Sequence, residues 1–248
     1  MKIERVKTGI PGLDELIEDG FPRGSTILVS GEPGTGKTIF GLQFLIEGAK
    51  NNERGLYVSF EQNLDDILLQ CEKFRWYVRQ YIDNGTLKIS SFDIKEFKFD
   101  DMVQEIKSSN ISRVVVDSLS SIISHPIAWE DIDTYYMITN KLDRLVPSPK
   151  YNIVIATRIF VHKIIDELKK LPCTSILTSE LVGGSHGGFS RDTISEFLVD
   201  GLIILRYMVV GGEYSRNLTI QKMRYTKHSE NIHPIEIRKD VGLVVLKP

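Results

Sequence analysis

The sequence predicts an α/β fold, in which a mostly parallel β-sheet is flanked by helices and extended by C-terminal antiparallel strands. Between residues 27 and 49, a short apolar segment, a glycine-rich loop and a helical apolar pattern follow one another. Further apolar runs of strand length alternate with helical patterns, as is typical of parallel sheets. These runs are 55–60, 87–92, 113–117 and 173–180. Strand patterns without intervening helices then occupy 201–207, 216–223, 235–238 and 243–246.

The composition fits one globular domain spanning residues 1–248. The chain is 42% hydrophobic, and no linker rich in Gly, Ser or Pro divides it. Its formal charge of −2 argues against coating nucleic acid or a membrane by bulk charge, but it leaves room for a local basic groove. Cys71 and Cys173 have neither metal-ligand spacing nor a disulfide framework. We find no signal segment and no apolar run of about 18 residues, so we expect a cytoplasmic protein without a membrane partner.

The first strand follows a short N-terminal segment. Pro11 and Gly12 predict a turn before a short helix, and residues 20–24 turn the chain into the strand at 27–30. The glycine-rich loop comes next, and helical apolar spacing begins at Ile39. The loop consists of Gly31, Glu32, Pro33, Gly34, Thr35, Gly36, Lys37 and Thr38.

This loop has the P-loop spacing of glycine, any four residues, glycine, lysine and threonine. Its glycines allow successive backbone N–H groups to point at phosphate oxygens, and the following helix adds its N-terminal dipole. Lys37 can reach the β- and γ-phosphates, and the Thr38 hydroxyl can ligate Mg²⁺. The stretch from Gly31 to Ile39 is therefore predicted to bind ATP with Mg²⁺ as cofactor. A chance glycine-rich turn is the alternative, but strand and helix stand in the required order.

Carboxylates follow two of the other predicted strands. Glu61 comes directly after 55–60, at the strand end where ligands meet open α/β sheets. It is our candidate to orient or deprotonate the attacking water. Asp117 ends the run of three valines at 114–116 and is predicted to hold the Mg²⁺ shell together with Thr38. An exposed strand-end glutamate and a helix N-cap are the plainer readings of these two residues.

Besides the helix after the P-loop, four helices are expected further along the chain, at 64–82, 100–109, 130–145 and 152–170. The aromatic residues of the first favour core packing over base stacking. Residues 151–156 could also form a strand, but the apolar spacing that follows favours a helix. The residues at this spacing are Ile155, Ile159, His162, Ile165 and Leu168.

A glycine-rich loop at 183–191 follows the predicted strand at 173–180. Four glycines in six residues predict a mobile connection, and such loops often carry function. Gly187, Gly188 and Arg191 are our candidates for nucleic-acid contacts, although no basic cluster accompanies them. Gly211 and Gly212 then predict a hairpin turn in the strand-rich tail.

Several motifs occur in an order that resembles the KaiC-like branch of the RecA/RadA P-loop ATPases. The resemblance covers nearly the whole chain and is greatest to single-domain archaeal members described as RadA paralogues. The motifs are Thr8–Asp14, the P-loop, Tyr57–Glu61, Val115–Ser118, Leu177–Glu180 and Lys222–Arg224 with Thr226 and His228.

The resemblance implies a RecA-like core that forms a hexameric ring or filament with ATP between subunits. Lys222 and Arg224 would reach the γ-phosphate of the neighbouring subunit's ATP, and His228 would lie near the nucleotide. Two positions depart from the family pattern. Gln62 stands where a second carboxylate is usual, which implies slow rather than absent hydrolysis, and Tyr225 replaces a glycine beside Arg224.

Three functions remain open on these grounds. The first is an Mg²⁺-dependent ATPase that binds single-stranded DNA as an accessory to homologous recombination and DNA repair, with a recombinase as partner. The loops at roughly 119–130 and 183–192 would then face the ring axis. The second is an ATP-driven signalling or assembly switch that acts on protein partners without DNA, which the acidic pI favours. The third is a nucleotide-binding structural subunit with negligible hydrolysis.

Overall fold

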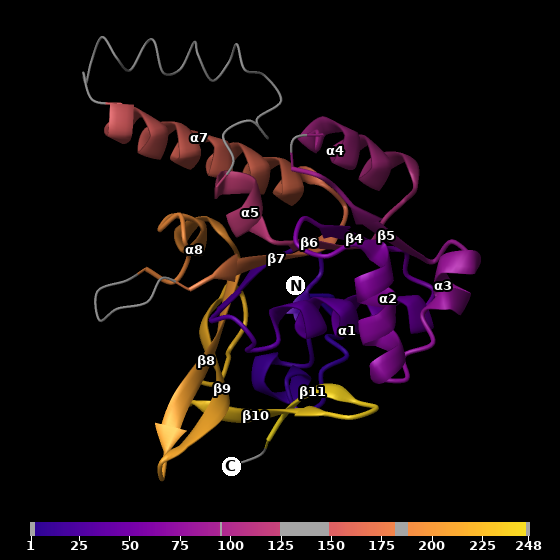
Figure 1. Cartoon of the computed structure of the whole chain (residues 1–248), viewed down its shortest axis with the longest axis vertical. Helices are drawn as coiled ribbons and strands as arrows, with labels where there is room; N and C mark the ends of the chain where they lie inside the picture. The colour runs from indigo at the N-terminus through magenta and orange to yellow at the C-terminus, as the bar shows by residue number, and fades with distance from the viewer. Residues whose placement is uncertain (1–2, 95, 125–148, 182–187, 247–248) are drawn as a thin grey trace.

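The computed structural model describes residues 3–94, 96–124, 149–181 and 188–246, and Figure 1 shows the arrangement of their elements. Each strand and helix lies close to an apolar run of the sequence. The main strands are β3 (Thr26–Gly31), β4 (Gly55–Ser59), β5 (Leu87–Ser91), β6 (Arg113–Asp117), β7 (Thr174–Glu180), β8 (Gly201–Val210), β9 (Glu213–Met223), β10 (His233–Arg238) and β11 (Gly242–Val245). The helices are α1 (Lys37–Lys50), α2 (Leu64–Lys73), α3 (Arg79–Asp83), α4 (Phe99–Ser108), α5 (Leu119–Ser124), α7 (Pro149–Lys170) and α8 (Ser195–Leu198).

Nine of the described strands form one large sheet in the order β11-β10-β9-β8-β3-β7-β6-β4-β5. Strands β8, β3, β7, β6, β4 and β5 pair with their neighbours in parallel. Strands β8, β9, β10 and β11 pair with one another antiparallel, each with the next along the chain. This arrangement confirms the predicted fold class, including the antiparallel extension. A small sheet of β1 (Arg5–Val6) and β2 (Phe21–Pro22) was not predicted, because two-residue strands leave no pattern in the sequence.

Helices cover both faces of the sheet, so the central strands are buried on both sides. Helices α1, α2 and α3 lie on one face, and α4, α5 and α7 lie on the other (Figure 1). Strand β6 carries apolar side chains on both faces. Val115 packs in the core on the α1 side, and Val114 and Val116 pack in the core on the α7 side. Side chains alternate between the faces of a strand, so a strand covered on both faces is apolar throughout.

The helix predicted over 64–82 is wrong as one element. It divides into α2 and α3, with Arg75 between them in the left-handed region at φ 54°. The amide of Trp76 donates to the carbonyl oxygen of Cys71 at 2.9 Å, which closes the end of α2 and turns the chain. The predicted core role of the aromatic residues is confirmed, because Phe74 and Trp76 stack with ring centroids 4.8 Å apart against the α1-side core.

Helix α7 confirms the helix expected over 152–170, but part of the predicted apolar stripe is wrong. Ile159 is 46% exposed and His162 is exposed, while Val161, Ile164 and Leu168 are buried. The helix is therefore rotated relative to the predicted face, because its C-terminal turns pack Val161 and its neighbours against the sheet. The helix expected at 130–145 lies outside the described residues.

Candidate functional site

The glycine-rich loop joins β3 to α1 in the order that the sequence predicts. Gly36 directly precedes α1 with φ 108°, in the left-handed region that favours glycine, and no side chain caps the helix. A Cβ atom on Gly31 would lie 2.7 Å from Oγ1 of Thr35 and 2.8 Å from the carbonyl oxygen of Leu205. The loop thus requires glycine at both positions, and the amides of the first turn of α1 remain available for an anion.

Lys37 folds its side chain over this loop. Its Nζ donates to the carbonyl oxygens of Gly31 at 2.8 Å and Glu32 at 3.1 Å. Burial lowers the pKa of the Lys37 ammonium, while the charges of Asp117, Glu61, Glu180 and Glu32 oppose that shift. A phosphate group here would give this buried cation an anionic partner.

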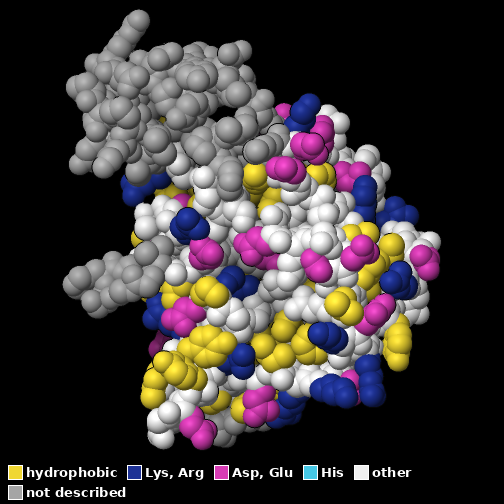
Figure 2. Space-filling view, viewed as in Figure 1, with side chains coloured by type: hydrophobic (Ala, Val, Ile, Leu, Met, Phe, Trp, Pro, Cys, Tyr) yellow, Lys and Arg dark blue, Asp and Glu magenta, His cyan; other side chains and the backbone are white. Residues whose placement is uncertain are grey.

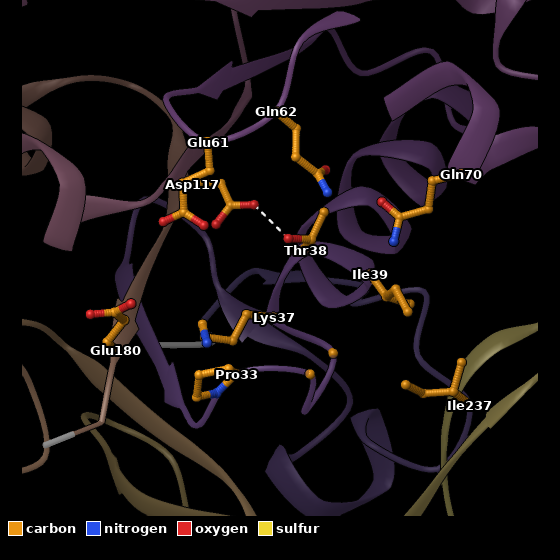
Figure 3. A pocket seen from close by; sticks show the side chains of 12 residues that line it. Pro33, Lys37, Thr38, Ile39, Glu61, Gln62, Gln70, Asp117, Glu180 and Ile237 are labelled. Atoms are coloured by element: carbon orange, nitrogen blue, oxygen red, sulfur yellow. Dashed lines mark hydrogen bonds between the residues drawn. The ribbon is translucent and has the colours of Figure 1, made fainter. Parts of the chain in front are cut away.

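Thr38 and Asp117 meet at the next position along the loop. The hydroxyl of Thr38 donates to Oδ2 of Asp117 at 2.7 Å (Figure 3). Tyr57 donates to the same oxygen at 2.5 Å, and Thr178 donates to Oδ1. Burial, followed by the charge of Asp117, raises the pKa of the Tyr57 phenol well above its usual value, so this group remains a donor. The Asp117 carboxylate is therefore held on three sides.

The Thr38–Asp117 pair fits a Mg²⁺ ion. A hydroxyl oxygen and one carboxylate, completed by phosphate oxygens and water, are the ligands that this cation commonly uses beside phosphates. Among the described residues, no group of three or more His, Cys, Asp and Glu side chains could hold a metal without such help. The arrangement thus suits a metal that arrives with a phosphate ligand.

Glu61 projects into the same site from the chain that follows β4. Its Oε1 accepts hydrogen bonds from the hydroxyls of Ser118 at 2.6 Å and Ser121 at 3.0 Å. Ser118 is fully buried and directly follows Asp117, so the end of β6 positions the carboxylate that comes from β4. The two carboxylates predicted from separate strands are brought together.

A cavity of about 310 Å³ joins these side chains. Its lining includes Gln70, Glu180 and Ile237, which were not predicted as site residues, and Gln62, which was noted only for the carboxylate that it replaces. Glu180 follows the rule that identified Glu61, because it ends a strand beside β3. Gln70 and Ile237 come from α2 and β10, and a single sequence carries no signal that these distant elements border the loop. The full lining is Pro33, Gly34, Gly36, Lys37, Thr38, Ile39, Glu61, Gln62, Gln70, Asp117, Glu180 and Ile237.

Lys222, Arg224 and His228 do not line this cavity. Lys222 donates to the carbonyl oxygens of Glu196 and Phe197, and Arg224 forms an ion pair with Asp200 at 3.3 Å. Nδ1 of His228 lies 3.1 Å from the carbonyl oxygen of the next residue. The site of one chain therefore does not bring these three residues to the P-loop.

The predicted nucleic-acid residues are only partly described. Gly187 lies outside the described residues, and Gly188 packs near Glu196. Arg191 forms an ion pair with Glu180 at 2.6 Å, so its charge faces a carboxylate. Residues 119–124, predicted as the start of an axis-facing loop, form helix α5 because their apolar residues pack against the sheet.

The fold and this geometry together define a P-loop nucleotide-binding site on a RecA-type α/β sheet. The profile of the family described as "ATPase: KaiC" matches residues 6–131 and 141–248. The chain therefore belongs to the KaiC family of ATPases.

Similar proteins support this membership. A UPF0273 protein of Pyrococcus furiosus is 34% identical over 98% of this chain and 94% of its own length. The circadian clock oscillator protein KaiC of Picosynechococcus is 29% identical over 96% of this chain, which covers 44% of that protein. The crystal structure of a KaiC-like protein of Pyrococcus horikoshii, 33% identical, superposes with a TM-score of 0.80 over 99% of this chain and 100% of its own. Within the described residues, no helix has the length and apolar character needed to cross a membrane.

Proposed function

We propose that this chain is a Mg²⁺-dependent ATPase that assembles head to tail, as a hexameric ring or a filament, with ATP at the subunit interfaces. The observation that carries the hydrolytic part is the joint position of the Thr38–Asp117 pair and Glu61 beside the P-loop. Thr38 and Asp117 would hold Mg²⁺, which neutralises charge on the phosphates when bound. Glu61 would orient the attacking water and accept its proton.

The charge of the pocket supports a contribution from outside the subunit. The charged side chains that line the pocket are one cation, Lys37, and three carboxylates, Glu61, Asp117 and Glu180. One cation faces three carboxylates, and the phosphates of ATP would add further negative charge. Mg²⁺ and additional cations would therefore stabilise the charge that develops in the transition state.

Lys222 and Arg224 are the proposed source of those cations, acting on the nucleotide of a neighbouring subunit. The backbone amide of Arg224 donates to the carbonyl oxygen of Asp200. In the register of β8 with β3, Asp200 lies beside Thr26, which is five residues before Gly31. At about 3.3 Å per residue, this separation is roughly 17 Å along the sheet, too far for the Arg224 side chain to reach its own P-loop. Lys222 is level with Leu28 on β3, and its Nζ donates to the carbonyl oxygens of Glu196 and Phe197 rather than to the loop. Loop and cations thus occupy opposite ends of the sheet, as a heterologous, ring-forming or filament-forming interface requires.

The β8–β9 hairpin provides a second feature that suits assembly. Figure 2 shows hydrophobic side chains gathered at the lower left, over this hairpin, where Val209 is 65% and Tyr214 is 79% exposed. Tyr207 ties the hairpin to the loop by donating to the carbonyl oxygen of Gly34 at 2.9 Å. Apolar surface beside a phosphate-binding loop is well placed for a subunit contact.

For the cellular role, we propose an ATP-driven switch that acts on protein partners. The ion pair of Arg191 with Glu180 favours this role, because Arg191 is the only Lys or Arg of 183–192. Figure 2 also shows Lys and Arg side chains interspersed with Asp and Glu on this face of the described residues. The second candidate is the single-stranded-DNA-binding recombination accessory, which rests on the resemblance to RadA paralogues.

Steady-state ATP hydrolysis with Mg²⁺ or EDTA, with and without single-stranded DNA at low salt, tests the proposal. We expect Mg²⁺-dependent turnover that DNA does not change. Glu61→Gln should lower kcat by on the order of 10²-fold or more while ATP still binds. Glu72→Gln, on the exposed side of α2, is the matched control and should retain wild-type turnover.

Two results would contradict parts of this proposal. Stimulation of hydrolysis by DNA, together with DNA binding measured by anisotropy, would favour the recombination accessory over the protein-directed switch. ATP binding without measurable hydrolysis would favour a nucleotide-binding structural subunit, in keeping with the glutamine at position 62.

A further inference from the structure

Two glutamine side chains in the pocket have amide oxygens without a hydrogen-bond partner. Oε1 of Gln62 and Oε1 of Gln70 are buried and unpaired, and both residues line the P-loop cavity. Only four buried side-chain atoms are unpaired among the described residues, so this cavity holds half of them. A buried acceptor without a donor costs about 1–3 kcal/mol, and native proteins rarely leave such atoms unpaired. A ligand that carries N–H donors would satisfy them.

The pocket has two chemically different ends. In Figure 3, Glu61, Asp117 and Glu180 lie on one side of the P-loop, while Ile39, Gln70 and Ile237 lie on the other. Our inference rests on the proposed ATPase function, which directs the γ-phosphate towards Glu61. The nucleoside must then extend the opposite way, towards the amide and the two isoleucines.

The second end has the chemistry of a base-binding site. A Cβ atom on Gly36 would lie 3.4 Å from Cδ1 of Ile237, so the isoleucine from β10 sits directly over the last glycine of the loop. Ile39 lies in the first turn of α1 and adds a second apolar side chain. Flat heterocycles bind well to such apolar surfaces, which leave recognition to a few polar groups.

We propose that Gln70 is the specificity-determining residue that selects adenine. Its Oε1 accepts a hydrogen bond from the exocyclic 6-amino group of adenine, which lies against Ile39 and Ile237. A glutamine amide matches the adjacent donor and acceptor of adenine, whereas guanine presents two acceptors on that edge. With GTP, Oε1 of Gln70 would stay buried and unpaired, and a site built to pair with a donor rejects the analogue that lacks it.

Gln62 is less suited to this role. Its backbone is fixed on both sides by Ser59, whose hydroxyl donates to the Gln62 carbonyl oxygen at 2.7 Å and accepts from its amide at 3.0 Å. In Figure 3 its side chain lies between Glu61 and Gln70, further from Ile237 than Gln70 is. Gln70 lies further along α2, on the side of Ile237 in Figure 3.

The test compares the equilibrium affinities of three nucleotides in the presence of Mg²⁺: ATP, GTP and purine riboside triphosphate, which lacks the 6-amino group. The full-length protein should bind ATP about 10- to 100-fold more tightly than GTP. Gln70→Leu should weaken ATP binding about tenfold and should weaken the binding of GTP and the purine analogue much less, because these two share only the ring acceptor with adenine. Gln62→Leu and the exposed Gln80→Leu on α3 are matched controls that should keep the wild-type ratio.

Four other outcomes of this experiment would each lead to a different conclusion. If the wild-type protein binds none of the three nucleotides, the proposed ATPase function fails. If it binds ATP but Gln70→Leu leaves the ATP-to-GTP ratio unchanged, the ATPase proposal stands and Gln70 is not the selector. A ratio lost in Gln62→Leu alone would transfer selection to Gln62 and overturn our assignment. Equal weakening of all three nucleotides by Gln70→Leu would indicate a structural role and would also overturn it.

Discussion

Oγ1 of Thr38 lies 2.7 Å from Oδ2 of Asp117, although 79 residues separate the two in the sequence. This contact joins the first turn of α1 to the end of β6 and assembles the proposed Mg²⁺ ligands. Replacing Thr38 with Val removes the hydroxyl at nearly constant volume. We expect the Mg²⁺ concentration for half-maximal ATP hydrolysis to rise by about tenfold or more. Thr38→Ser keeps the hydroxyl and should stay near wild type; equal Mg²⁺ requirements in the two variants would exclude Thr38 as a ligand.

Substitution of Lys37 gives a second test of the P-loop assignment. Because its ammonium is buried over the P-loop backbone, Lys37→Ala should remove the only cation among the described pocket-lining side chains and abolish tight ATP binding. Lys50→Ala, at the exposed C-terminal end of the same helix, is the control and should bind ATP normally. Calorimetric titration with ATP and Mg²⁺ distinguishes the two. Unchanged affinity in Lys37→Ala would remove the P-loop assignment.

Substitution of Ser118 tests whether this residue orients the Glu61 carboxylate. Its buried hydroxyl donates to Glu61 Oε1 at 2.6 Å, and a hydrogen bond to a charged group contributes about 1.5–3 kcal/mol. Ser118→Ala should therefore lower kcat by about tenfold and leave KM for ATP unchanged, because the base loses orientation while nucleotide contacts remain. Ser121→Ala removes the longer, more exposed bond and should have a smaller effect. If KM rises and kcat does not change, Ser118 serves binding rather than orientation.

Local patterns predicted the parts of the site that lie at the ends of strands. The P-loop, Glu61 and Asp117 each follow a buried apolar run, and parallel strands bring their carboxyl ends to one edge of the sheet. The position of these residues therefore follows from the alternation of strands and helices. The same rule applied to β7 would have added Glu180.

The base-binding half could not be predicted in this way. Ile237 lies on β10, in the antiparallel extension, and it reaches the loop only because the chain returns across the sheet to pack beside α1. Gln70 lies within α2, and the helical pattern of that segment does not show that this position borders the P-loop. Both depend on tertiary packing rather than on periodicity.

Glu53 offers a test of stability away from the site. It forms an ion pair with Arg113, which is 2% exposed, at 2.5 Å. Burial alone would raise the pKa of Glu53, but Arg23 and Arg113 outweigh it and lower the pKa from its usual value. Glu53→Gln leaves the Arg113 charge buried and should cost about 3 kcal/mol in the free energy of unfolding at pH 7. Glu4→Gln, in an exposed pair with Arg23, should cost less than about 1 kcal/mol.

The pH dependence of this effect has a definite sign. A carboxylate whose pKa is lowered in the folded state contributes stability above its unfolded pKa, near 4.5, and loses it as pH falls through the folded value. The difference between wild type and Glu53→Gln in urea denaturation should therefore shrink as pH is lowered below about 4.5. A difference that stays constant with pH would show that the charge of Glu53 is not the cause.

The opposite placement of the P-loop and Arg224 on the sheet leads to a test by mixing subunits. Arg224→Ala should lower turnover by about 10²-fold or more without loss of the fold, because it removes a cation from the neighbouring site. Lys37→Ala should be inactive because its own site cannot bind ATP. In mixed assemblies, however, an intact Arg224 on a Lys37→Ala subunit would face the intact P-loop of an Arg224→Ala subunit. The mixture should therefore hydrolyse ATP faster than the sum of the two variants, whereas a strictly additive rate would place Arg224 outside its neighbour's site.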